Sequence, residues 1–154
     1  MAQFHVEEVL PASPAELWPW LTVPSRMNRW SEATVTLEAA GEDGGPASAG
    51  ARRRVDLRAF GLTFRMHEVV VEARPPERFV YRVTRAPGLK AHRGEIDLRA
   101  EGAGTRLTWR VEFRTGLPGA EPLFAAVVRP RLLRSVRALA ALVAAGGGST
   151  TGGG

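Results

Sequence analysis

The sequence contains no cysteine and only one lysine, Lys90, and none of its apolar runs is long enough to span a bilayer. Without cysteine the chain forms no disulfide and offers no thiolate as a nucleophile or as a metal ligand. The first residues include neither a basic leader nor an apolar segment of signal-peptide length. We therefore expect a cytoplasmic protein with no membrane span.

The positive charge of the chain is almost entirely arginine. The sequence carries 21 Lys and Arg against 16 Asp and Glu, a formal net charge of +5 at pH 7, and its pI is near 11.1. No helix-turn-helix, zinc-finger or RNA-binding motif accompanies this charge, so no nucleic-acid partner is expected. Arginines instead recur at alternate positions of expected strands, as on the solvated face of a sheet: Arg78, Arg82, Arg99, Arg106, Arg110 and Arg114.

The motifs of several enzyme classes are also missing. The histidines at positions 5, 67 and 92 are scattered, and no pair of them has helical ligand spacing, so no metal is expected. Neither glycine-rich run leads into a Lys-Ser or Lys-Thr pair, which argues against a phosphate-bearing cofactor. Because there is no Gly-x-Ser-x-Gly elbow and no cysteine nucleophile, covalent acyl chemistry lacks its usual groups. We expect no cofactor.

Length and composition favour a single domain. The chain has 154 residues, of which 44% are hydrophobic and 24% charged, and a chain of this size buries a core without disulfides. We assign residues 1–145 to one domain. Residues 146–154 consist of Gly, Ser and Thr alone, which predicts a flexible tail.

In the first half of the chain, apolar alternation and helix-start signals predict strands and two short helices. Ser13 and Glu16 form a capping box around Pro14, which predicts the first helix, and Pro24 ends it. A second helical turn is expected over 25–30. Strands are expected over 3–10, 34–40 and 52–58. We interpret the run of arginines at 52–54 as a charged edge strand that resists aggregation.

In the second half, strands are followed by one long helix. Strands are expected over 62–74, with a bulge near His67 and Glu68 where the alternation changes phase, and over 78–85, 92–98 and 107–113. After residue 119 the apolar period changes from two to about four, which predicts an amphipathic helix. Pro130 either kinks this helix or opens its main segment, and we favour the kink.

This order of elements, with three sequence passages, resembles the SRPBCC superfamily. The passages are 9–18 (VLPASPAELW), 75–82 (PPERFVYR) and 104–109 (GTRLTW). The resemblance covers nearly the whole chain before the glycine-rich end, and within the superfamily it is strongest to the polyketide cyclase/dehydrase and lipid-transport group. It implies an α+β helix-grip fold: a curved antiparallel sheet of six to seven strands around a long C-terminal helix, with two short helices after the first strand.

The resemblance also implies a cavity for a small hydrophobic molecule between the concave face of the sheet and the C-terminal helix. Strand parity and the apolar stripe of the helix indicate which side chains could line it. The strand candidates are Phe79, Tyr81, Val83, Ile96, Leu98, Trp109, Val111 and Phe113. The helix candidates are Val128, Leu132, Val136 and Leu139.

Few polar groups share the inward parity, and two of them are candidates for catalysis. His92 lies two residues before Gly94, which leaves room beside an imidazole that exchanges protons near neutral pH. The alternative interpretation is that His92 lies at the exposed end of a strand and has no functional role. Tyr81 could orient a carbonyl through its hydroxyl, and its alternative is a core tyrosine with one structural hydrogen bond.

Three functions are compatible with this sequence. The first is a non-covalent carrier or sensor of an apolar metabolite, favoured because few catalytic groups converge. The second is an aromatase/cyclase-type enzyme, in which His92 and Tyr81 handle protons during aldol closure and dehydration of a polyketide-like substrate. The third is a co-chaperone-like or toxin-antitoxin-like module whose basic surface meets an acidic partner protein.

Overall fold

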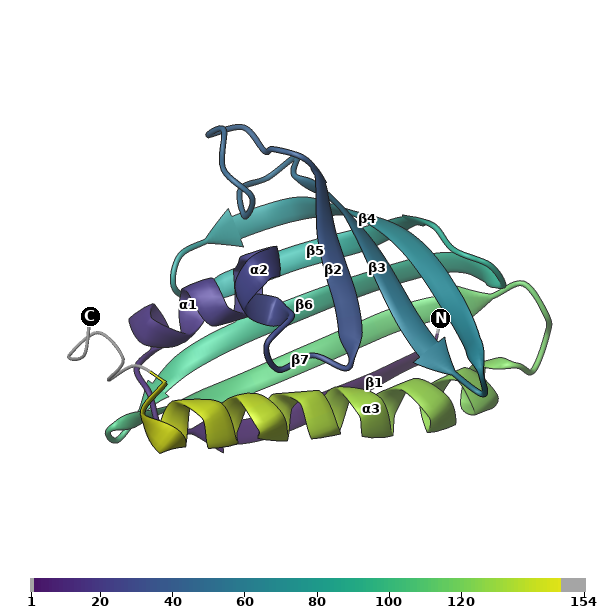
Figure 1. Cartoon of the computed structure of the whole chain (residues 1–154). Coiled ribbons are helices and arrows are strands. Elements are labelled where there is room, and N and C mark those ends of the chain that lie inside the picture. Colours follow the sequence, from purple (N-terminus) through teal and green to yellow (C-terminus); the bar gives the residue numbers. More distant parts are fainter. Residues whose placement is uncertain (1, 148–154) are drawn as a thin grey trace.

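The computed structural model describes residues 2–147 and contains one antiparallel sheet of seven strands, in the order β1-β7-β6-β5-β4-β3-β2. The strands are β1 (Ala2–Leu10), β2 (Ala33–Ala39), β3 (Arg52–Ala59), β4 (Leu62–Arg74), β5 (Arg78–Arg85), β6 (Leu89–Glu101) and β7 (Gly104–Thr115). The helices are α1 (Pro14–Thr22), α2 (Pro24–Met27) and α3 (Glu121–Leu142), followed by the π-helical turn η1 (Val143–Gly147). Figure 1 shows the sheet curving around the long helix α3. The expected helix-grip fold is confirmed.

The two short helices follow from their caps and prolines. Ser13 precedes α1 in extended conformation, and its Oγ accepts a hydrogen bond of 3.2 Å from the Glu16 N–H, while Pro14 takes the first helical position. Pro24 then opens α2, which ends at Met27 and is shorter than the helical turn predicted over 25–30. These helices cover one end of the sheet in Figure 1.

The structure tests two sequence predictions, one in β4 and one in α3. The register between β4 and β5 shifts between His67 and Glu68, so the predicted bulge is confirmed. Pro130 lies inside α3, which continues from Glu121 to Leu142, and therefore does not open the main helical segment. Residues 148–154 of the predicted tail lie outside the described residues.

On the convex face of the sheet, several of the strand arginines form ion pairs. Arg78 donates to Asp97 at 3.1 Å, and Glu95 lies within salt-bridge distance of Arg78, Arg93 and Arg110. Charge of both signs thus alternates over this solvated surface, as the strand parity predicts. No helix in residues 2–147 is long and apolar enough to cross a membrane.

The edge-strand interpretation of residues 52–54 is wrong. The edges of the sheet are β1 and β2, and β3 pairs with both β2 and β4. Within β3, Arg53 is the residue that departs most from the expectation of a solvated arginine, since its exposed fraction is only 1%. A guanidinium this deeply buried needs an anionic partner, which the candidate site supplies.

Candidate functional site

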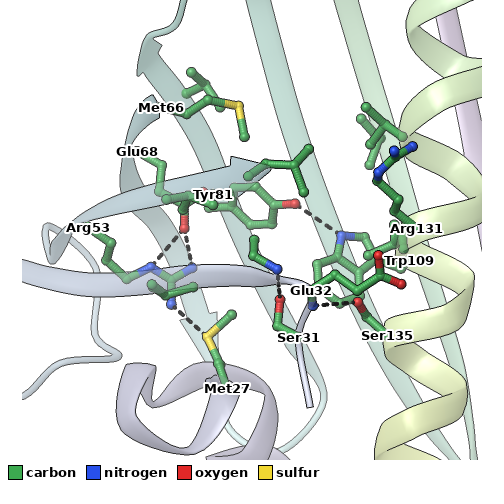
Figure 2. Close-up of a pocket in the computed structure, with 18 of the residues that line it drawn as sticks. Met27, Ser31, Glu32, Arg53, Met66, Glu68, Tyr81, Trp109, Arg131 and Ser135 are labelled. Atoms are coloured by element: carbon green, nitrogen blue, oxygen red, sulfur yellow. Dashed lines mark hydrogen bonds and ion pairs between the residues drawn. The ribbon is translucent and has the colours of Figure 1, made fainter. Parts of the chain in front are cut away.

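A cavity of about 120 Å³ lies between the sheet and α3. Its wall is mostly apolar, and the residues contributed by the sheet and by α3 approach it from opposite sides (Figure 2). The apolar lining residues are Leu21, Met27, Ala33, Val35, Val55, Leu57, Met66, Val83, Ile96, Trp109, Val111, Val128 and Leu132. The polar lining residues are Ser31, Glu32, Arg53, Glu68, Tyr81, His92, Arg131 and Ser135.

A buried ion pair forms part of this wall. Arg53 and Glu68 lie directly opposite each other on β3 and β4, and the side chains are 1% and 6% exposed. The Nε and Nη2 groups of Arg53 both donate to Oε1 of Glu68, the first at 2.8 Å, and Nη1 donates to the Thr22 carbonyl at 3.2 Å. The guanidinium also lies 5.1 Å from the centre of the Phe79 ring. Its hydrogen-bonding groups are therefore committed almost entirely to the protein.

A second polar pair joins Tyr81 on β5 to Trp109 on β7. The indole Nε1–H of Trp109 donates to the Tyr81 hydroxyl at 3.1 Å, as Figure 2 shows. Burial raises the pKa of the Tyr81 phenol, and the nearby charge of Glu68 raises it further. The phenol therefore stays protonated at neutral pH and remains a hydrogen-bond donor.

His92 on β6 is a buried, neutral imidazole. It is 8% exposed, and its ring centre lies 6.1 Å from that of Tyr81 and 6.2 Å from that of Phe124. Burial lowers the pKa of His92 to about 4, because the charged form loses its hydration there. The Nδ1 atom is fully buried and has no hydrogen-bond partner among the described residues. We refer to Arg53, Glu68, Tyr81 and His92 as the inner end of the cavity.

The opposite side, which we call the mouth, lies where Glu32 and Arg131 line the cavity and reach solvent. The Glu32 N–H donates to the Ser135 hydroxyl at 2.9 Å, and the Glu32 carboxylate pairs with Arg134. Arg131 donates to the Val127 carbonyl at 2.8 Å and stacks over the Phe60 ring at 5.7 Å. Arg131 has no carboxylate partner among the described residues, so the mouth holds the cavity's unpaired positive charge.

The described residues contain no metal-ligand set. No group of three or more His, Cys, Asp or Glu side chains in residues 2–147 is placed to hold an ion. The polar side chains of the inner end can form hydrogen bonds to a bound molecule, and the His92 imidazole can accept a proton.

A family model described as polyketide cyclase / dehydrase and lipid transport matches residues 1–144. The chain belongs to this family. No curated protein matches the chain, so the family is defined by the model and by the fold.

Solved structures share the fold at low sequence identity. A START superfamily protein from Mycobacterium smegmatis superposes with a TM-score of 0.77 at 14% identity, over 90% of this chain and 94% of its own. Major latex-like protein 151 from Panax ginseng has a TM-score of 0.73 at 11% identity, and the match covers 91% of this chain and 95% of the ginseng chain. The di-domain ARO/CYC protein StfQ from the steffimycin biosynthetic pathway has a TM-score of 0.72 at 15% identity, over 90% of this chain and half (50%) of its own.

The structure divides the residues predicted to line the cavity into two groups. Those that line it are Tyr81, Val83, Ile96, Trp109, Val111, Val128 and Leu132, together with His92. Those that pack in the surrounding core instead are Phe79, Leu98, Phe113, Val136 and Leu139. Strand parity gives the face of a residue but not its position relative to the covering helices. Phe79 meets Trp18 of α1 at 5.9 Å between ring centres, and Phe113 meets Phe124 of α3 at 4.5 Å.

Sequence reasoning missed Glu68 and misjudged Arg53. A usable signal was present, because Phe60 and Gly61 form a two-residue turn with positive φ between β3 and β4. A two-residue turn fixes the register of the hairpin, and counting outward from it places Arg53 opposite Glu68. Opposite charges at facing positions then indicate an ion pair.

Gly94 shapes the inner end by the absence of its side chain. It lies opposite Tyr81 in the register of β5 and β6, and a Cβ built at Gly94 would overlap the Tyr81 ring at Cζ and at the hydroxyl oxygen. The space that the sequence suggested for His92 is therefore filled by the Tyr81 ring. Only glycine allows the phenol to lie flat across β6 and reach Trp109.

Gly94→Ala is expected to lower the free energy of unfolding by about 1–3 kcal/mol, because the Tyr81 ring is packed and has to leave its position. Urea denaturation followed by tryptophan fluorescence measures the loss, and a changed Trp109 environment should accompany it. The control is Gly116→Ala, whose Cβ would meet only the Gly88 carbonyl at 3.8 Å, an ordinary contact. A similar loss in both variants would contradict a specific role for the gap at Gly94.

Proposed function

We propose that the protein is a non-covalent carrier or sensor that binds a small, mainly apolar molecule in the cavity between the sheet and α3. The observation that carries this proposal is the cavity itself, with its apolar wall and with its buried titratable side chains gathered at the inner end. The family, whose description includes lipid transport, supports the same reading. Burial of an apolar ligand in such a wall supplies about 25 cal/mol for each Å² removed from water.

The volume indicates the size of this ligand. An apolar cavity of about 150 Å³ binds benzene, so this cavity of about 120 Å³ together with its mouth accommodates roughly six to ten non-hydrogen atoms. That is the size of one aromatic ring with short substituents. A longer ligand would extend through the mouth.

Filling the cavity is expected to prevent binding. We expect Leu132→Phe, on the α3 wall, to weaken binding of single-ring aromatic compounds about tenfold or more, because the added ring occupies their space. Native mass spectrometry and calorimetry measure the change, starting from a panel of single-ring phenols, polycyclic phenols, flavonoids, fatty acids and sterols. The control is Leu123→Phe on the same helix, where the side chain is 69% exposed and does not line the cavity. Equal affinity in both variants would place the ligand elsewhere.

A second candidate is a cofactor-independent cyclase-type enzyme, favoured by the pairing of a neutral His92 with a protonated Tyr81. In an aldol closure, a base removes a proton next to one carbonyl, a carbon–carbon bond forms at a second carbonyl, and water then leaves. His92 would accept and return the proton, and the Tyr81 hydroxyl would donate to the carbonyl oxygen. The fold shared with StfQ is compatible with this candidate.

Turnover separates the two candidates. With a linear poly-β-ketone as substrate, the cyclase candidate predicts that His92→Ala lowers the rate of cyclisation at least about a hundredfold. Binding of the substrate should be unchanged. Tyr81→Phe should lower the same rate. Binding of the poly-β-ketone without cyclisation above the uncatalysed rate, in the unmodified protein, would leave the carrier or sensor as the function.

A further inference from the structure

Three side chains at the inner end of the cavity have hydrogen-bonding capacity that the protein does not use. Both of the hydrogen bonds that Arg53 donates to Glu68 end on Oε1, and Oε2 of that carboxylate has no partner among the described residues. The Tyr81 hydroxyl accepts from Trp109, but no acceptor for its own proton is found in residues 2–147. His92 Nδ1 is buried without a partner. An unpaired buried polar group costs about 1–3 kcal/mol.

These three groups lie on the neighbouring strands β4, β5 and β6 and all line the cavity. In the register, Glu68 faces Val83, two positions along β5 from Tyr81, so the two side chains start from diagonal positions. The Tyr81 hydroxyl then extends across β6 to Trp109, and the rings of Tyr81 and His92 lie 6.1 Å apart. A ligand head that carries two polar groups on one ring can therefore meet more than one of the three side chains.

The inner end carries no unpaired charge. The positive charge of Arg53 is balanced by Glu68 within the wall, Tyr81 is protonated, and His92 is neutral. A carboxylate placed here would have no free cation beside it and would face the carboxylate of Glu68, which makes its burial unfavourable. The remaining cation of the cavity, Arg131, lies at the mouth.

We propose that the inner end recognises an uncharged ligand head with both a hydroxyl donor and a carbonyl acceptor, as in a hydroxylated aryl ketone. The Tyr81 O–H donates to the carbonyl oxygen, Oε2 of Glu68 accepts from the ligand hydroxyl, and the neutral His92 supplies a further donor or acceptor. The ligand thus enters head first, with its apolar part toward Val128 and Leu132. This inference rests on the proposed binding function and narrows its ligand class.

The test compares single-ring compounds of similar size by calorimetry on the full chain at neutral pH. The series is meta-hydroxyacetophenone, its methyl ether, meta-ethylphenol, ethylbenzene and meta-hydroxybenzoate, which differ in donor, acceptor and charge. We expect the hydroxy ketone to bind about tenfold or more tightly than each of the others, because each of them leaves a buried group unpaired or brings an unbalanced charge. Tighter or equal binding of the benzoate or of ethylbenzene would overturn the inference.

Two variants test the orientation. Tyr81→Phe removes the donor to the carbonyl and is expected to abolish the preference for meta-hydroxyacetophenone over meta-ethylphenol, with melting temperature as the check that the variant folds. Arg131→Ala changes the wall at the mouth and is expected to leave the order of affinities within the series unchanged; loss of the preference for the hydroxy ketone in this variant would place the head at the mouth and overturn the inference. If Tyr81→Phe does not fold, the series on the unmodified protein decides.

The series also separates this inference from the proposed function. Binding of ethylbenzene or the benzoate without preference for the hydroxy ketone refutes the uncharged head and leaves the cavity function intact. Binding of none of the compounds, and of none of the larger panel, refutes both.

Discussion

Replacing Glu68 with alanine is expected to lower the free energy of unfolding by about 3–5 kcal/mol, because it leaves the Arg53 guanidinium buried without its counter-charge. Arg53 is 1% exposed, so solvent screens its charge very little in the folded state. Its remaining bonds, to the Thr22 carbonyl and the Met27 sulfur, provide no negative charge. Urea denaturation at neutral pH measures the loss.

The same hairpin offers a matched control. Asp56 and Arg65 also face each other across β3 and β4, with a hydrogen bond of 2.9 Å, but the Arg65 side chain is 55% exposed. Asp56 also lies 3.4 Å from Arg54, whose side chain is 34% exposed. Asp56→Ala therefore removes two solvent-screened pairs and should cost no more than about 2 kcal/mol. A loss of equal size at Asp56 and Glu68 would contradict the argument that burial decides the cost.

Removing both charges of the buried pair is expected to recover most of the stability. Arg53→Met together with Glu68→Leu replaces the pair with apolar side chains of similar length, which is neutral or stabilising in comparable cores. This variant should still bind ethylbenzene but should lose its preference for meta-hydroxyacetophenone. This result would assign the pair a role in ligand selectivity rather than in net stability.

The sequence predicts the fold better than it predicts the cavity, for a physical reason. Period-two alternation, the capping box at Ser13 and the change of period after residue 119 are local signals, and they give the helix-grip order correctly. Whether Phe113 lines a cavity or fills the core depends on Phe124 of α3, which packs against it from a distant part of the chain. No local pattern contains that contact.

The polar groups of the inner end also depend on contacts between strands that local sequence signals do not contain. The run of arginines at 52–54 suggests that Arg53 is a surface residue. Only the register of the β3–β4 hairpin shows that Glu68 is its partner. The sequence suggests that Gly94 leaves space for His92, but pairing of β5 with β6 brings the Tyr81 ring into that space instead. Pairing between strands, rather than the character of one strand, determines the chemistry of this site.

Because His92 is buried, the free energy of unfolding is expected to fall by about 2–4 kcal/mol as the pH decreases from about 6.5 to about 4. The pKa of His92 is lower in the folded state than in the unfolded state, so between these values the unfolded chain binds the extra proton. The stabilisation from a neutral His92 is fully present above the unfolded pKa and is lost as the pH approaches the folded value. The groups packed against the ring, Tyr81 and Phe124, carry no charge that could offset this loss.

His92→Gln isolates the effect, because glutamine keeps hydrogen-bonding capacity and does not titrate. The difference between the unfolding free energies of the two proteins should rise with pH across this window and be flat above it. Carboxylates that titrate in the same range are common to both proteins and cancel in the difference. A parallel pH dependence in both proteins would mean that His92 reaches solvent in the native state, and His92 could then not serve as the neutral group that meets an uncharged ligand head.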